Sequence, residues 1–114
     1  MSTPTSIRAS ALQQRLAQGE AIQLVDVRED QELAMARLPL PVLHLPLSRS
    51  AEWVERIEQL LERDRPVAVL CHAGVRSWQF GCWLIETHGY CDVLNLQGGI
   101  DAWSVEVDAA VPRY

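Results

Sequence analysis

The sequence predicts an α/β domain in which a central, mostly parallel sheet is flanked by helices on both faces. Short apolar runs alternate with longer amphipathic stretches, an order typical of strands joined by crossover helices. The run Val67 to Leu70 is continuously apolar, as expected for a strand that is buried on both faces. A chain of 114 residues is long enough for one hydrophobic core, so we expect residues 1–114 to form a single domain.

The first half of the chain contains one predicted helix and one predicted central strand. The helix is expected over Ser10 to Gln18, with apolar residues on one face and a glycine after its end. The strand is expected over Ile22 to Val27. Asp30 to Leu47 contains three prolines, which predicts an irregular connection with one short extended piece, Val42 to Leu45.

The second half repeats the alternation of helix and strand. Its predicted elements are a surface helix over Ala51 to Arg63, a buried strand over Val67 to Leu70, a mostly apolar helix over Ser77 to His88, a strand over Asp92 to Leu96, a tight turn at Gly98 and Gly99, and a short helix over Ile100 to Trp103.

Composition and charge exclude several classes of protein. The net charge is −5 and all ten basic residues are arginines scattered among acids, which argues against nucleic-acid binding. No apolar run reaches the length of a membrane span, and the N-terminal residues lack the layout of a signal peptide, so we expect a cytoplasmic protein without membrane contact. Three cysteines without paired spacing argue against a disulfide framework and predict at least one free thiol.

The candidate site is the segment Cys71, His72, Ala73, Gly74, Val75, Arg76, Ser77, hereafter the Cys71 loop. It lies between a buried strand and a helix, where parallel sheets collect ligands and helix N-termini favour negative charge. Gly74 lets the backbone curl so that N–H groups point toward the sulfur, and Arg76 can close the ring. Such a setting lowers a thiol pKa from about 8.5 into a range of roughly 3.5 to 7.5, so Cys71 is the candidate nucleophile.

The remaining reactive residues have simpler interpretations. Cys82 lies within a predicted helix and is expected to pack in the core. Cys91 is expected to be an inert residue at the start of a strand. His72 is a possible base toward the thiol, although neighbouring side chains usually point apart. Core packing of Cys71 itself is the alternative to a reactive thiol.

Three motifs resemble the rhodanese family of sulfurtransferases. They are D-V-R-E at Asp26 to Glu29, C-H-A-G-V-R-S at Cys71 to Ser77 and G-G-I-D-A-W at Gly98 to Trp103, and the likeness extends over most of the chain. The resemblance implies a rhodanese fold in which Cys71 carries sulfane sulfur as a persulfide. It also implies that Asp26, Arg28 and Glu29 are supporting contacts near the site.

The resemblance implies a two-step transfer without metal or organic cofactor. Cys71 takes sulfur from a small anionic donor such as thiosulfate and passes it to cyanide, a thiol or a protein acceptor. Arg76 and Arg28 are expected to attract the anionic donor. The closing V-P-R-Y at Val111 to Tyr114 is similar to the end of rhodanese domains that stand alone or are fused to adenylating enzymes, so a sulfur-carrier or adenylating-enzyme partner is possible.

Two alternatives and one departure remain. A phosphatase or arsenate reductase uses a related Cys-to-Arg loop, but four residues separate Cys71 from Arg76 here and the phosphatase loops are longer. A non-catalytic binding or sensory module is the second alternative. The sequence departs from the family pattern in the segment Ala36 to Pro41, hereafter the departing segment. It lacks the histidine and both glycines that family members carry there, so its backbone geometry is left open.

Overall fold

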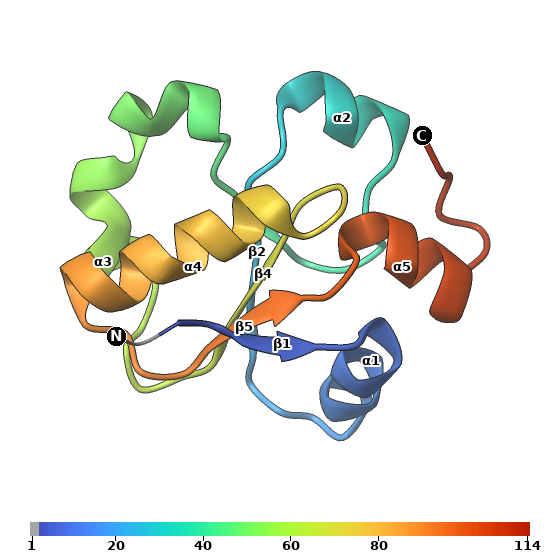
Figure 1. Cartoon of the computed structure of the whole chain (residues 1–114), viewed down its shortest axis with the longest axis horizontal. Helices are drawn as coiled ribbons and strands as arrows, with labels where there is room; N and C mark the ends of the chain where they lie inside the picture. Colours follow the sequence, from blue (N-terminus) through green and yellow to red (C-terminus); the bar gives the residue numbers. More distant parts are fainter. Residues whose placement is uncertain (1–2) are drawn as a thin grey trace.

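The computed structural model describes residues 3–114 and contains one five-stranded sheet (Figure 1). The strand order is β1-β5-β4-β2-β3, and every neighbouring pair is parallel. The strands are β1 (Thr5–Ile7), β2 (Gln23–Asp26), β3 (Leu43–His44), β4 (Val67–Leu70) and β5 (Val93–Leu96). This arrangement confirms the predicted α/β class with a parallel sheet.

Helices cover both faces of the sheet. They are α1 (Ala9–Ala17), α2 (Asp30–Met35), α3 (Ile57–Leu60), α4 (Val75–His88) and α5 (Gly99–Glu106), with the 3₁₀ segments η1 (Leu47–Glu52) and η2 (Val54–Arg56) before α3. Leu12 of α1 and Ile100 of α5 belong to the core on one face. Ile57 of α3 and Leu84 of α4 belong to the core on the other face.

The central strand β4 determines which way the candidate nucleophile points. All four of its residues are buried, and alternate side chains enter opposite cores because successive residues of a strand face opposite sides of the sheet. Ala68 and Leu70 pack in the core beneath α1 and α5. Val67, Val69 and Cys71 pack in the core beneath α3 and α4. The alternation therefore sends the Cys71 side chain toward α4.

The predicted helix over 51–63 is wrong as a single element. The segment contains parts of η1 and η2, followed by the four-residue α3. Trp53, between η1 and η2, has φ −132° and ψ −16°, outside the helical region. Its buried indole donates a hydrogen bond to the Pro46 carbonyl at 3.0 Å. We attribute the break to this anchoring, which holds Trp53 in the core in place of regular helical geometry.

The expectation that Asp30 to Leu47 is irregular was wrong over its first six residues, which form α2. A capping box begins this helix, because Glu29 and Glu32 each accept a hydrogen bond from the other's backbone N–H. The short extended piece is present as β3. In the departing segment after α2, Ala36 and Leu38 are buried in the core.

The strand β1 was not predicted. It is only three residues long and joins the sheet edge by pairing with β5, with Thr5 beside Leu94. None of the helices within residues 3–114 combines the length and the apolar character needed to cross a membrane.

Candidate active site

The Cys71 loop connects the end of β4 to the N-terminal end of α4 (Figure 1). Gly74, the residue before α4, has φ +108°, a conformation that L-residues with a side chain rarely adopt. This turn brings the Gly74 N–H to 3.1 Å from Cys71 Sγ. The positive end of the helix dipole favours negative charge at the same place. The structure thus brings Cys71, Gly74 and the start of α4 together, as the sequence pattern predicted.

The environment of Cys71 exerts opposing effects on its thiol. Burial is the largest single influence and raises the pKa, since the residue is 1% exposed. Hydrogen bonds from the Ser77 hydroxyl and from the backbone N–H groups of Ser77, Gly74 and Ala73 lower the pKa. The hydrogen bonds together outweigh burial, so the pKa of Cys71 lies below its ordinary value. The Cys71 thiol therefore ionises more readily than an ordinary cysteine.

The first turn of α5 holds the loop in this orientation. The N–H of Ile100 donates to the Cys71 carbonyl at 2.9 Å, and the N–H of Asp101 donates to the His72 carbonyl at 3.3 Å. Gly99 permits this approach, because a Cβ there would lie 2.3 Å from the His72 oxygen. The carbonyls of Cys71 and His72 thus bond to α5, while the loop N–H groups that follow remain available to the sulfur. Gly98 lies in the predicted turn, whereas Gly99 is already the first residue of α5. The close approach of Gly99 to the loop was not predicted.

Ser77 and Asn95 form a buried polar pair beside the sulfur. The Ser77 Oγ lies 3.2 Å from Cys71 Sγ and 2.5 Å from Asn95 Oδ1. The Asn95 Nδ2 donates to the Gly74 carbonyl at 3.1 Å. Asn95 was missed by the sequence analysis, although one signal was present: it is a polar residue inside a run of buried strand residues.

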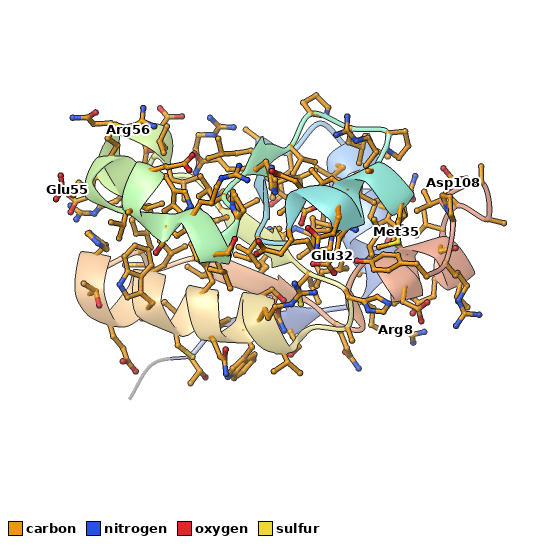
Figure 2. The ribbon with its side chains drawn as sticks, turned by 90° about the horizontal axis from the view of Figure 1, so that it is seen from above. Arg8, Glu32, Met35, Glu55, Arg56 and Asp108 are labelled. Carbon is orange, nitrogen blue, oxygen red and sulfur yellow. The ribbon has the colours of Figure 1, made fainter. Side chains whose placement is uncertain are left out.

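Arg76 forms a two-bond ion pair with Glu32 of α2. Its Nη1 and Nη2 donate to the two carboxylate oxygens at 2.6 and 2.8 Å. Figure 2 shows Glu32 on the side of α2 that faces the layer of α4. The hydrogen bond from Arg76 is the main cause that lowers the pKa of Glu32 to about 2. The expected closure of the loop by Arg76 stays a prediction, because the guanidinium bonds to Glu32 and its charge is compensated there.

Tyr114 completes the rim of the site. Its ring stacks on His72 with 4.2 Å between ring centroids and an interplanar angle of 15°. Its hydroxyl donates to Glu32 at 2.9 Å and accepts from Arg28 at 2.9 Å. His72 therefore lies against an aromatic ring, and neither Glu32 nor Tyr114 was identified as a site residue from the sequence.

The expectation that Arg28 attracts an anionic donor is contradicted by its burial. Its side chain is 0% exposed and pairs with Asp26 at 2.8 Å. It also donates to the Ala36 carbonyl at 2.8 Å, and thereby ties the departing segment to the end of β2. Glu29 caps α2 and accepts hydrogen bonds from Ser48. The side chains of Asp26, Arg28 and Glu29 therefore stabilise the end of β2 and the start of α2. Within residues 3–114, none of the three forms a hydrogen bond with Cys71.

All three cysteines are free thiols. Cys82 lies half-buried in α4, which is less buried than expected. Cys91 is exposed and lies before the start of β5. Of the three sulfur atoms, only Cys71 has hydrogen-bond donors arranged around it within the described residues.

The parallel sheet and the amide-lined loop between β4 and α4 place this chain among α/β proteins with a cysteine-containing anion loop. A family model for the Rhodanese-like domain matches residues 8–106. The chain therefore belongs to the rhodanese-like domain family.

Relatives and solved structures agree with this assignment. The chain is 37% identical over 102 residues to a protein named Sulfurtransferase from Allochromatium vinosum, and 86% of each chain is covered. A crystal structure of a rhodanese-like domain protein from Staphylococcus aureus superposes with a TM-score of 0.75 at 27% identity, covering 96% of this chain and 98% of that one. These relatives support sulfurtransferase activity at the level of the family.

Some relatives are much longer than this chain. It is 39% identical to the Rhodanese-like/PpiC domain-containing protein 12, chloroplastic, of Arabidopsis thaliana, with 81% of this chain and 30% of that protein covered. It is 29% identical to the Adenylyltransferase and sulfurtransferase UBA4 of Debaryomyces hansenii, with 86% of this chain and 22% of that protein covered. The chain thus corresponds to one part of these proteins.

Replacing Gly99 by alanine is expected to break the contact between α5 and the loop. The new Cβ would lie 2.4 Å from the Cys71 carbonyl oxygen, at a residue with φ +61°. Gly89→Ala is the matched control, since Gly89 has φ +70° and no atom within 4 Å of the added Cβ. We expect Gly89→Ala to cost about 1–2 kcal/mol and Gly99→Ala about 1–3 kcal/mol more, measured by urea unfolding. Equal losses in the two variants would contradict the close contact.

Replacing Glu32 by glutamine is expected to destabilise the protein in a pH-dependent way. Because the pKa of Glu32 falls from 4.5 to about 2 on folding, the carboxylate contributes stability above about pH 4.5 and loses it as the pH falls toward 2. At pH 7 we expect Glu32→Gln to lower the free energy of unfolding by about 1–3 kcal/mol. The difference from the parent should shrink below about pH 4.5.

The control for this measurement is Glu55→Gln. Glu55 is exposed on η2, away from Glu32 (Figure 2), and its replacement is expected to change the free energy of unfolding by less than about 0.5 kcal/mol. A Glu32→Gln difference that stays constant down to the acid limit of folding would argue against a charged pair with Arg76.

Proposed function

We propose that this protein is a sulfurtransferase that carries sulfane sulfur on Cys71 as a persulfide. The observation that supports this most directly is the set of donors at Cys71 Sγ, namely the Gly74 N–H at 3.1 Å and the Ser77 hydroxyl at 3.2 Å. These donors favour the thiolate, which is the reactive form of a cysteine. They also supply N–H groups where a terminal persulfide sulfur would carry negative charge.

The proposed reaction has two displacement steps. The Cys71 thiolate attacks the outer sulfur of the donor, the S–S bond of the donor breaks, and its electron pair leaves with sulfite or with a thiolate. A nucleophilic acceptor, such as cyanide, a thiol or a protein group, then attacks the outer sulfur of the persulfide. The S–S bond to Cys71 breaks and its electron pair returns to Sγ, which restores the thiolate.

The charge around the loop bears on the choice of donor. Arg76 is paired with Glu32 and Arg28 with Asp26, so backbone N–H groups supply most of the attraction for an anion. We propose either thiosulfate or a persulfide as donor, with Arg76 as the cation nearest the entrance. A dianion such as thiosulfate gains full access to Arg76 only by competing with the Glu32 carboxylate.

A phosphatase or arsenate reductase is the less favoured alternative. Only four residues lie between Cys71 and Arg76, and the Arg76 guanidinium is bonded to Glu32 instead of pointing freely into the loop. Cys71 is also only 1% exposed, which suits a reaction with one small atom better than with a tetrahedral oxyanion. A binding or sensory module would need no donors at the sulfur, so their presence favours catalysis over this alternative.

We further propose a protein partner in a sulfur relay. The similarity to the protein named Adenylyltransferase and sulfurtransferase UBA4 favours a sulfur-carrier or adenylating enzyme as partner. A cytoplasmic location is the setting that we propose for such a relay, since cytosolic conditions keep thiols reduced.

Intact-protein mass spectrometry after incubation with thiosulfate or glutathione persulfide tests the proposed function. The parent protein is expected to gain one sulfur atom, which added cyanide removes. Cys71→Ser is expected to abolish this gain and to lower sulfur transfer by at least about 10³-fold, because the transferring nucleophile is lost.

Cys91→Ser provides the matched control, because Cys91 is exposed and precedes β5, whereas the Cys71 loop follows the parallel strand β4 at the opposite end of the sheet. It is expected to load and release sulfur like the parent. If Cys71→Ser still gains sulfur, another cysteine carries it and the proposal is wrong. If neither donor loads the parent protein and the parent hydrolyses a phosphate ester, the phosphatase alternative is favoured.

A further inference from the structure

The inference concerns Asn95, a buried polar residue in the sheet. It is 5% exposed and lies between Leu94 and Leu96 in β5. The register pairs it with Val69 of β4, two residues before Cys71. A buried amide without partners costs several kcal/mol, so a strand position of this kind normally holds an apolar side chain. The position of Asn95 therefore requires a reason.

The two hydrogen bonds of Asn95 fix the direction of its amide. The Gly74 carbonyl only accepts, so the Asn95 nitrogen faces it at 3.1 Å. The Asn95 carbonyl oxygen consequently faces the Ser77 hydroxyl at 2.5 Å. An acceptor is thus held beside Ser77 by the same loop residue whose N–H contacts the sulfur.

Ser77 has one hydroxyl proton and two neighbours that can accept it. Asn95 Oδ1 lies 2.5 Å from its oxygen and Cys71 Sγ lies 3.2 Å from it. When Cys71 is a neutral thiol, its S–H can donate to the Ser77 oxygen while the hydroxyl donates to Asn95. When Cys71 is a thiolate, the Ser77 hydroxyl adds to the stabilisation by the backbone N–H groups if it turns toward the sulfur, and does not if it stays on Asn95.

We propose that Asn95 is a positioning residue that holds the Ser77 proton while the Cys71 sulfur is neutral and releases it when that sulfur becomes an anion. The switch is a rotation of one hydroxyl group, and no proton is transferred between residues. Its role in the reaction rests on the proposed function. Before donor attack the hydroxyl faces the thiolate, and after persulfide formation the inner sulfur is neutral and the hydroxyl returns to Asn95.

The release step gives this rotation a use. When an acceptor attacks the outer sulfur, the breaking S–S bond leaves its electron pair on Cys71 Sγ. The Ser77 hydroxyl then turns from Asn95 to the sulfur and stabilises the leaving thiolate. Asn95 thus prevents the hydroxyl from taking an arbitrary direction in the persulfide form, where the loop N–H groups hold the outer sulfur.

Other charged and titratable groups surround the loop and have to stay constant in a test. Arg76 from α4 is paired with Glu32 from α2. His72 in the loop stacks on Tyr114 from the C-terminal segment. Asn95 of β5 and Ser77 of α4 carry no charge. Variants at these two positions therefore leave the charged groups at the site in place.

A double-mutant cycle on Ser77 and Asn95 tests the proposal without any sulfur donor. The thiol of Cys71 is titrated through the ultraviolet absorbance of its thiolate, and the matched Cys71→Ser protein is subtracted to remove Cys82 and Cys91. We expect Ser77→Ala to raise the pKa, with an acid dissociation constant about fivefold smaller. We expect Asn95→Val to lower the pKa, with a constant about fivefold larger, because the hydroxyl then has only the sulfur as acceptor.

The Ser77→Ala background separates the switch from a structural role. There the Asn95→Val change is expected to alter the acid dissociation constant less than about twofold. An equal effect in both backgrounds, or a raised pKa in Asn95→Val alone, would overturn the proposal, because Asn95 would then act only through the Gly74 carbonyl. Persulfide loading is measured separately, so its failure would count against the proposed function and not against the switch.

Nuclear magnetic resonance of the parent protein covers the case in which Asn95→Val does not fold. The side-chain amide signals of Asn95 are expected to shift with the same midpoint as Cys71 ionisation, and Ser77→Ala should remove that shift. Asn95 signals that stay constant through the ionisation of Cys71 would overturn the proposal.

Discussion

The hydrogen bonds from the first turn of α5 to the carbonyls of Cys71 and His72 decide how the loop faces the sulfur. A short loop between a strand and a helix can direct either its carbonyl or its N–H groups inward, and a thiolate tolerates only the second arrangement. Ile100 and Asp101 bond to the two carbonyls, and Gly99 is small enough to allow it. The turn after β5 therefore sets the electrostatics at the end of β4.

The site combines burial with hydrogen bonding, and the two have opposite effects on the thiol pKa. Burial of Cys71 shields the sulfur from water, and this burial opposes ionisation of the thiol. Several short donors are needed to reverse that opposition, because each contributes only about 1 kcal/mol. This requirement explains why Ser77 and Gly74 both approach the same sulfur atom. It also explains why the Asn95 amide forms a hydrogen bond with each of these two residues.

The sequence predicted the parts of the structure that local patterns determine. The apolar run of β4 and the glycine-containing loop after it were recognised because burial and backbone freedom leave a signal within a few residues. The strand β1 was missed, because three residues carry no periodicity and their pairing with β5 is a long-range event. The contacts of Glu32 and Tyr114 were missed for the same reason, since these residues lie 44 and 82 positions from their partners Arg76 and Glu32.

The wrong expectation for Arg28 shows that a charged residue in a motif does not reveal how deeply its side chain is buried. Arg28 and Arg76 both follow a strand end, and a sequence gives no measure of how deeply each lies. The structure encloses Arg28 with Asp26 and the Ala36 carbonyl, where removing one partner would leave a buried charge. Arg76 pairs at the rim, where its partner Glu32 also bonds to Tyr114. The buried arginine thus fixes the shape of the strand end, whereas Arg76 is the partly exposed one of the two cations.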